Sequence, residues 1–126
     1  MHYRPFDKQL ELRNVADGAE TTTQAETGIA LAVLAAGDFK VIVYVTALSA
    51  TGTKSISIET DSVVGFGDTP VAIASQAIAA TGVYEFPLSA AQIAKLDPNA
   101  AAIRVKATLG GSDPSITYGA YIVPTV

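Results

Sequence analysis

The residues that could act in catalysis are few, and the first to consider is the only histidine, His2. A serine or cysteine nucleophile needs a base beside it, but the chain has no second histidine and no cysteine. His2 also lies within residues 1–7, which show neither a helical nor a strand period and are typical of an extended arm. We therefore expect His2 to be an exposed residue without a catalytic role, and we expect the protein not to be an enzyme.

Two carboxylates occur in the segment Asp61-Ser-Val-Val-Gly-Phe-Gly-Asp68, whose loop carbonyls could complete a calcium site. The spacing is not that of an EF-hand loop, and Asp and Gly are common turn formers. The segment also lacks the Lys-Ser/Thr pair of a phosphate-binding loop, and Glu59, Asp61 and Glu85 form no pattern typical of the paired acids of a glycosidase. We predict no catalytic residue, no metal and no cofactor; a metal in residues 61–68 stays open as an alternative.

The charge of the chain argues against nucleic-acid and membrane partners. Its 126 residues carry a net charge of −4 and the eight Lys and Arg residues are scattered, so phosphate backbones and anionic lipids would repel it. The longest apolar stretch, residues 29–36, is too short to span a bilayer, and residues 1–8 lack the apolar core of a signal peptide. We expect synthesis in a cytoplasm. Only 16% of the residues are charged, so we expect a partner to cover part of the surface.

The clearest strand is predicted for residues 38–48. Alternation places Phe39, Val41, Val43 and Val45 on one face and Lys40, Ile42, Tyr44 and Thr46 on the other. Ile42 and Tyr44 would then lie outside a simple two-layer core. We expect either another segment of the chain or a partner subunit to cover them.

Further short strands, separated by turns, are predicted in residues 9–15, 20–31, 53–60, 71–78, 83–88, 103–109 and 116–123, although residues 30–36 could equally form one helical turn. Residues 38–48 and 53–60 are predicted to form one hairpin, and residues 103–109 and 116–123 a second. Ser89 and Gln92 have the spacing of a capping box, which predicts a short helix at residues 90–96 that stops at Asp97-Pro98. The predicted fold is an all-β antiparallel β-sandwich, jelly-roll-like, with an arm at residues 1–8 and one domain at residues 9–126.

Several short motifs carry a resemblance to a known family. They are Phe6-Asp-Lys-Gln-Leu-Glu-Leu12, Ile56-Ser-Ile-Glu-Thr-Asp-Ser62, Thr81-Gly-Val-Tyr-Glu-Phe-Pro87, Ile103-Arg-Val-Lys-Ala-Thr-Leu-Gly-Gly111 and Tyr118-Gly-Ala-Tyr-Ile122. In this order they resemble the small cement, or decoration, proteins of tailed-phage capsids. The predicted helix at residues 90–96 departs from that pattern. The resemblance implies a jelly-roll-like fold, homo-oligomers on the capsid exterior of the virion, and contacts that clamp adjacent subunits of the major capsid protein.

A cement protein needs apolar patches and extended arms rather than chemistry. We therefore expect Tyr3, Arg4, Pro5 and Phe6 to dock on the major capsid protein. Ile42 and Tyr44, or the loop that carries Phe66, would contribute to self-association as a dimer or trimer. The alternative for Phe66 is that its ring only anchors its own loop.

Two other functions remain open at this point. Jelly rolls often bind carbohydrate, so a carbohydrate-binding or receptor-binding module is the leading alternative. Sugar platforms usually use exposed aromatic residues, however, and the chain has no Trp, while its tyrosines alternate as strand residues. Another virion part, such as a tail or head-completion protein, is the second alternative.

Overall fold

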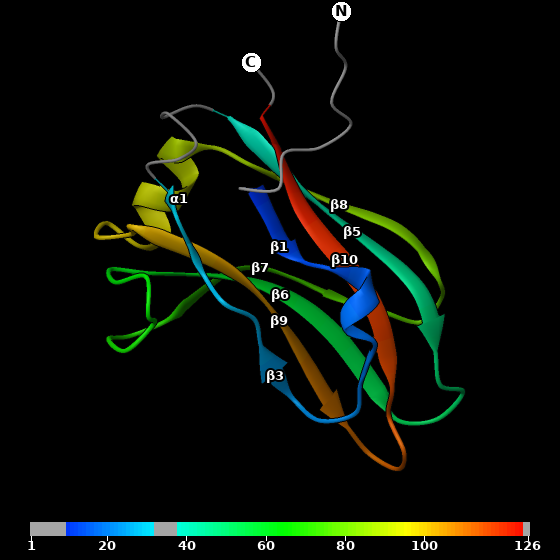
Figure 1. Cartoon of the computed structure of the whole chain (residues 1–126). Helices are drawn as coiled ribbons and strands as arrows, with labels where there is room; N and C mark the ends of the chain where they lie inside the picture. The colour runs from blue at the N-terminus through cyan, green and yellow to red at the C-terminus, as the bar shows by residue number, and fades with distance from the viewer. Residues whose placement is uncertain (1–9, 32–37, 125–126) are drawn as a thin grey trace, which may run out of the picture.

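The computed structural model describes residues 10–31 and 38–124, and these fold into two antiparallel sheets that face each other (Figure 1). The predicted arm at residues 1–8 lies outside the described residues. Sheet A contains, in spatial order, β1 (Glu11–Arg13), β10 (Ile116–Pro124), β5 (Phe39–Leu48) and β8 (Gly82–Leu88). Sheet B contains β3 (Gln24–Ala25), β9 (Ala102–Gly110), β6 (Thr53–Asp61) and β7 (Val71–Ala77).

Two further short strands lie along the edges where β1 and β3 already pair, so they do not make the sheets wider. β2 (Ala19–Glu20) pairs with Ile116 and Thr117 at the start of β10, while β1 pairs with Ala120 and Tyr121 further along the same strand. β4 (Ile29–Ala30) pairs with β9 in the same way as β3 does. The predicted strand at residues 20–31 is therefore three short strands, which pass from sheet A to sheet B. Each sheet is thus four strands wide.

The order of the strands is that of a jelly roll. The antiparallel pairs β1–β10, β3–β9, β5–β8 and β6–β7 are nested in the sequence, and successive pairs alternate between the two sheets. This is the wrapping of two Greek keys into a double-sheet sandwich. The all-β, jelly-roll-like sandwich predicted from the sequence is confirmed.

Both predicted hairpins are wrong. β5 pairs with β10 and β8 in sheet A, whereas β6 pairs with β9 and β7 in sheet B. The turns at residues 49–52 and 111–115 therefore bridge the sheets at the same end of the sandwich. They are hydrogen-bonded to each other, because Ser49 N–H donates to Ser115 O at 3.0 Å and Ser115 N–H donates to Ser49 Oγ at 2.9 Å. Alternation determines which face of a strand is buried but not which strand lies beside it.

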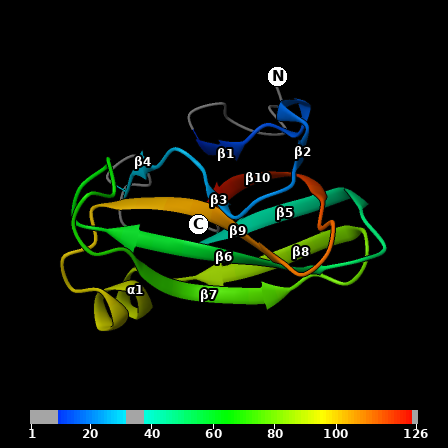
Figure 2. The same ribbon diagram turned by 90° about the horizontal axis from the view of Figure 1, so that it is seen from below.

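The core lies between the sheets, and the predicted inward faces supply it. Val41 and Val43 of β5, Ile56 and Ile58 of β6, and Val105 of β9 are fully buried. β-branched residues pack well on a pleated surface, which is why these segments form strands. The predicted helix is also confirmed as α1 (Ala90–Leu96), which closes one end of the sandwich and buries Ile93 (Figure 2). Ser89 begins it, since its Oγ accepts from Gln92 N–H at 3.1 Å.

Arg13 departs from the simple alternation of the first strand, in which Leu10 and Leu12 would face the core and Glu11 and Arg13 the solvent. Glu11 lies opposite Tyr121, but Arg13 lies opposite Ala120, so two residues of β1 advance against one residue of β10. This bulge turns the side chain of Arg13 to the inner face, where the residue is buried. Asn14 then begins the 3-10 helix η2 (Val15–Asp17), and its side chain accepts from Ala16 N–H at 2.8 Å.

Candidate protein-contact surface

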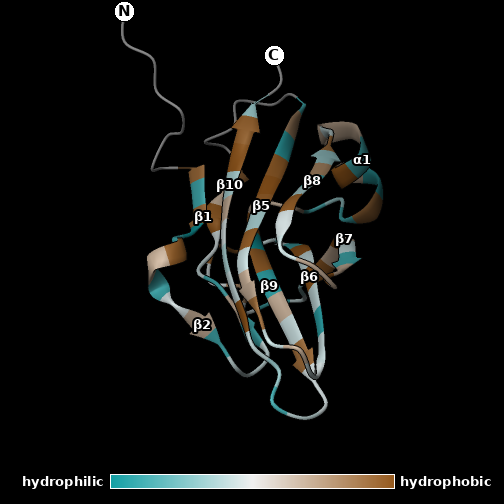
Figure 3. Ribbon diagram, turned by 90° about the vertical axis from the view of Figure 1, so that its right-hand side faces the viewer, coloured by the Kyte–Doolittle hydropathy of each residue, from teal (hydrophilic) through white to brown (hydrophobic). Residues whose placement is uncertain are grey.

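The outward side chains of β1, β10, β5 and β8 form a surface that we call the outer face of sheet A. In register across the sheet they make three rows: Val123, Lys40 and Pro87; Glu11, Tyr121, Ile42 and Glu85; and Gly119, Tyr44 and Val83. Figure 3 looks onto this sheet, and no described helix or strand lies in front of it. A sandwich with two layers leaves such a face without a third layer to cover it.

The centre of the outer face of sheet A is apolar. Ile42 is only 7% exposed, between Tyr121 and Glu85 in the register. The rings of Tyr44 and Tyr121 contact each other in a tilted arrangement, with centroids 5.9 Å apart and planes at 59°. Such aromatic pairs are common in the buried centres of protein interfaces.

Charged residues lie around this centre. Lys40 Nζ is 3.3 Å from Glu85 Oε1, and this exposed ion pair links β5 to β8. Burial raises the pKa of the Tyr44 phenol, and the nearby charges of Glu11 and Tyr121 raise it further. The phenol therefore stays uncharged at neutral pH. Interfaces between proteins commonly combine an apolar centre with a polar rim in this way.

Val83 extends the apolar centre to the edge of the sheet. Its side chain is 66% exposed, and β8 pairs with no strand but β5 among the described residues. Exposed edge strands are often protected by a charge or a proline, and β8 carries both Glu85 and Pro87. Val83 lies beside Tyr44 in the register and adds accessible apolar area to the face.

The opposite face of the sandwich, on sheet B, is polar. Glu59 of β6 accepts from Arg104 of β9, with Oε1 2.7 Å from Nη2, and its other oxygen is 3.9 Å from Lys106 Nζ. Its charged groups are thus paired within the chain. The two outer faces differ in chemistry, and the apolar one is on sheet A.

The structure brings together two of the residues that the sequence singled out for contacts. Ile42 and Tyr44 are neighbours on the outer face of sheet A, where Ile42 is covered within the chain and Tyr44 is half-buried. Tyr3, Arg4, Pro5 and Phe6 lie outside the described residues. Phe66 lies on the side of sheet B, where it packs against Arg104, whereas Tyr44 and Tyr121 belong to sheet A.

Phe66 anchors its own loop, which was the alternative to a contact role. The Arg104 guanidinium stacks over its ring at 4.2 Å from the centroid, and on another side the ring lies against Gly28. Phe66 is 9% exposed as a result. The contact role expected for this ring stays a prediction, although most of its surface already packs against other residues of the chain.

The loop at residues 61–68 is closed by the Asp61 carboxylate rather than opened toward a ligand. Oδ1 accepts from the N–H groups of Ser62 at 2.7 Å and Thr69 at 3.2 Å, and Oδ2 accepts from Asp68 N–H at 3.2 Å. Burial acts to raise the pKa of Asp61, but these backbone donors outweigh it and lower the pKa. Among the described residues, no three His, Cys, Asp or Glu side chains are grouped so as to hold a metal ion.

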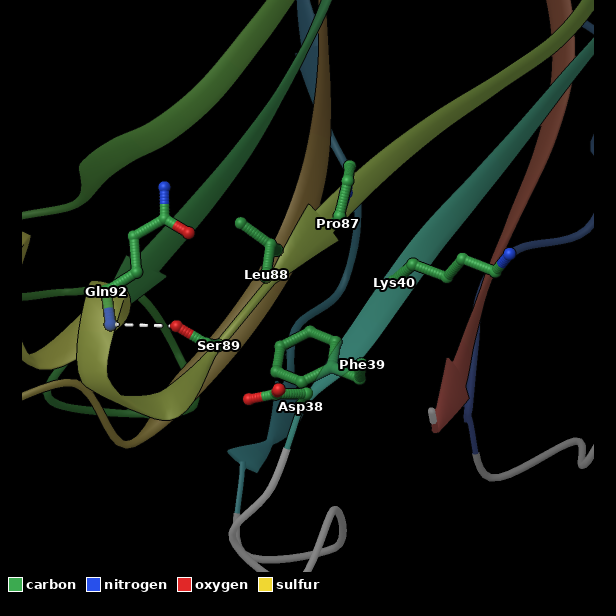
Figure 4. A pocket seen from close by; sticks show the side chains of 7 residues that line it. All are labelled: Asp38, Phe39, Lys40, Pro87, Leu88, Ser89 and Gln92. Carbon is green, nitrogen blue, oxygen red and sulfur yellow. Dashed lines mark hydrogen bonds between the residues drawn. The ribbon is translucent and has the colours of Figure 1, made fainter. Parts of the chain in front are cut away.

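A shallow pocket lies between the ends of β5 and β8 and the start of α1 (Figure 4). Its lining is mostly apolar or neutral and consists of Asp38, Phe39, Lys40, Pro87, Leu88, Ser89 and Gln92. The Ser89 hydroxyl already begins the helix, and Lys40 is paired with Glu85 and points away from the pocket (Figure 4). The pocket therefore has no converging acid, base and nucleophile for a reaction.

Tyr121 and Val83 were not singled out by the sequence analysis as contact residues. The signal was available, because Tyr121 and Val83 alternate with core residues in the same way as Tyr44 does. Only the register shows that the strands carrying these three residues lie side by side.

No family model, no curated protein and no solved structure matches this chain. No helix among the described residues is long and apolar enough to cross a membrane.

Proposed function

We propose that the protein is a structural component of a virion, a capsid cement or decoration protein that binds adjacent subunits of the major capsid protein on the head exterior. The observation that carries the proposal is the asymmetry of the sandwich. The outer face of sheet A presents an apolar centre with Tyr44 and the exposed Val83, whereas the face of sheet B is occupied by internal ion pairs. A protein that works by binding needs such a face and no reactive centre.

The sequence motifs support the same function, because they resemble cement proteins and the jelly roll they imply is the fold of this chain. The proposal includes self-association as a dimer or trimer. Light scattering on the purified protein measures this directly, and a monomer at all concentrations would remove that part.

The first experiment is a count of copies in particles made by the phage or prophage whose genome encodes the chain. Quantitative mass spectrometry should find hundreds of copies per head for a decoration protein. Six or twelve copies would place the protein at the portal or tail, and its absence from particles would overturn a virion role. A specific hit on a glycan array without capsid binding would instead favour the carbohydrate-binding alternative.

A matched pair of variants tests the surface. Val83→Asp places a charge on the apolar outer face of sheet A, and Thr108→Asp places the same charge at an exposed position of β9 in sheet B. Each variant is added to heads that lack the protein. We expect V83D to lower occupancy at least tenfold and T108D to bind as the native protein does. Equal binding by both would exclude this face as the contact surface.

A further inference from the structure

A cluster of charged side chains is buried where β1 and β2 of sheet A meet the segment after β3 of sheet B. The side chains of Arg13, Glu20 and Glu26 are 2%, 4% and 13% exposed. Tyr118 of β10 completes the cluster, with the Arg13 guanidinium 4.6 Å above its ring centroid. Charges are rarely buried unless they are paired, so the pairing in this cluster is informative.

Each of the three guanidinium nitrogens of Arg13 donates a hydrogen bond. Nη1 donates to Tyr118 O at 2.6 Å and Nη2 to Gly18 O at 2.9 Å, while Nε donates to Glu20 Oε2 at 3.2 Å. Nε also lies 3.3 Å from Glu26 Oε2 without forming a hydrogen bond to it. One guanidinium therefore faces two carboxyl groups.

The carboxyl groups are left with unpaired oxygens. Glu20 Oε1 and Glu26 Oε2 are both buried without a hydrogen-bond donor. If both groups were ionised, the cluster would hold a net negative charge away from water, which is costly. One proton on the pair removes this charge and also supplies the donor that the two oxygens lack.

The groups that face Glu20 come from three other segments: Arg13 from β1, Glu26 from the segment after β3, and Tyr118 from β10. Burial raises the pKa of Glu20 to about 8, as do the charge of Glu26 and the hydrogen bond that the Glu26 carboxyl makes with the protonated form, although Arg13 opposes this. Burial and the two carboxylates also raise the pKa of Tyr118, so its phenol stays neutral. Lys106 of the neighbouring strand β9 is directed to Glu59 on the outer face instead.

We propose that Glu20 and Glu26 share one proton and, with Arg13, form a latch that holds the β1–β2 edge of sheet A to sheet B, and that loss of this proton loosens the edge. The elements joined by the latch are short: β1 spans three residues, and β2 and β3 span two residues each. They make few backbone hydrogen bonds, so side-chain pairing contributes much of what holds them, and they belong to the parts of a fold that open first. This inference does not depend on capsid binding.

The direction of the pH effect follows from the pKa of Glu20. A carboxyl whose pKa is higher in the latched state than in the open state favours the latch at low pH and loses that contribution as pH rises through the higher value. The latch is therefore complete below pH 4.5 and weakens until about pH 8. In this window each pH unit increases opening by up to about tenfold, because one proton is released.

Amide hydrogen exchange of Glu26 reports the latch from its sheet B side, since the Glu26 N–H donates to Val105 O of β9 at 2.9 Å and so holds the segment that carries the Glu26 carboxyl. Exchange of this amide in the native protein should rise with pH more steeply than base catalysis alone would make it rise. Between pH 5 and 8 we expect opening of the latch to add up to about another tenfold acceleration per pH unit. Glu20→Gln keeps an uncharged donor at the same place and should exchange with the slope of base catalysis alone. Glu85→Gln, which changes the exposed partner of Lys40, should keep the native slope.

Two outcomes would overturn the proposal. One is native exchange that follows base catalysis alone, and the other is an E20Q variant that keeps the native slope. If E20Q does not fold, the side-chain carbon resonances of the glutamates in the native protein decide the matter. A Glu20 carboxyl that titrates at its ordinary pKa near 4.5 would rule out a shared proton.

Discussion

Tyr44 of β5 and Gly119 of β10 are cross-strand partners, and the ring of Tyr44 lies so close over the glycine that a Cβ added there would be 2.3 Å from the ring. The missing side chain makes room for the ring beside Tyr121. The position of Tyr44 on the outer face of sheet A is thus decided by a glycine on the neighbouring strand.

Gly119→Ala should displace the Tyr44 ring and leave the fold intact, because the clash is with the far end of a flexible side chain. We expect shifted Tyr44 ring resonances and a change in the free energy of unfolding of no more than about 1 kcal/mol, the range of strand propensities. In a Tyr44→Thr background the same substitution should have no steric cost. An unshifted Tyr44 ring in G119A would contradict the close approach.

Phe66→Ala should destabilise the protein by about 2 kcal/mol, since it removes a buried aromatic ring that packs against Arg104 and Gly28. Urea denaturation measures this change. Val64→Ala in the same loop is the control, because Val64 is 48% exposed and its truncation should cost at most about 0.5 kcal/mol. Equal effects of the two substitutions would mean that Phe66 does not anchor the loop.

Thr60→Val tests the link between β6 and the end of α1. Thr60 Oγ1 donates to Asp97 Oδ2 at 2.8 Å, and both residues are buried. Valine has a similar shape but no hydroxyl, so the Asp97 carboxylate loses a donor at a cost of about 1–3 kcal/mol. Thr108→Val at an exposed position of β9 should leave the urea midpoint nearly unchanged. A neutral T60V would show that Asp97 does not depend on this hydrogen bond.

Asp61→Asn should lower the urea midpoint at pH 7. The amide group of asparagine would place a donor against one of the backbone N–H groups that the Asp61 carboxylate now accepts. Asp113→Asn is the control, since Asp113 is exposed and has the left-handed φ of 49° that asparagine also adopts.

The same pair of variants gives a pH dependence. Because the pKa of Asp61 is lowered in the folded protein, its contribution to stability is present above its ordinary value of 3.8 and is lost as pH falls through the lower folded value. The difference between native protein and D61N should therefore be constant from pH 5 upward and shrink below about pH 4. A difference that grows on acidification would show that the carboxylate is not stabilised by these donors.

The faces of the long strands and the helix could be predicted from the sequence because both depend on near neighbours. In β5 a period of two separates Val41 and Val43 from Ile42 and Tyr44, and Ser89 begins α1 through a donor only three residues away. The same alternation predicted that Ile42 and Tyr44 lie on the outer face of this strand. The packing of Phe66 against Arg104 and Gly28 could not be predicted, since both residues are distant from Phe66 in the sequence.

By itself, the sequence determined that this chain makes strands with one buried face each, and that two sheets of such strands pack together through their buried faces as a sandwich. The tertiary structure alone decided which strands are neighbours, which turns bridge the sheets, and that a bulge in β1 turns Arg13 inward beside Glu20 and Glu26. The physical reason is the range of the interactions. Alternation is a property of residues two apart, whereas Arg13 donates to the carbonyl of Tyr118, 105 residues away, and such a pairing leaves no period in the sequence.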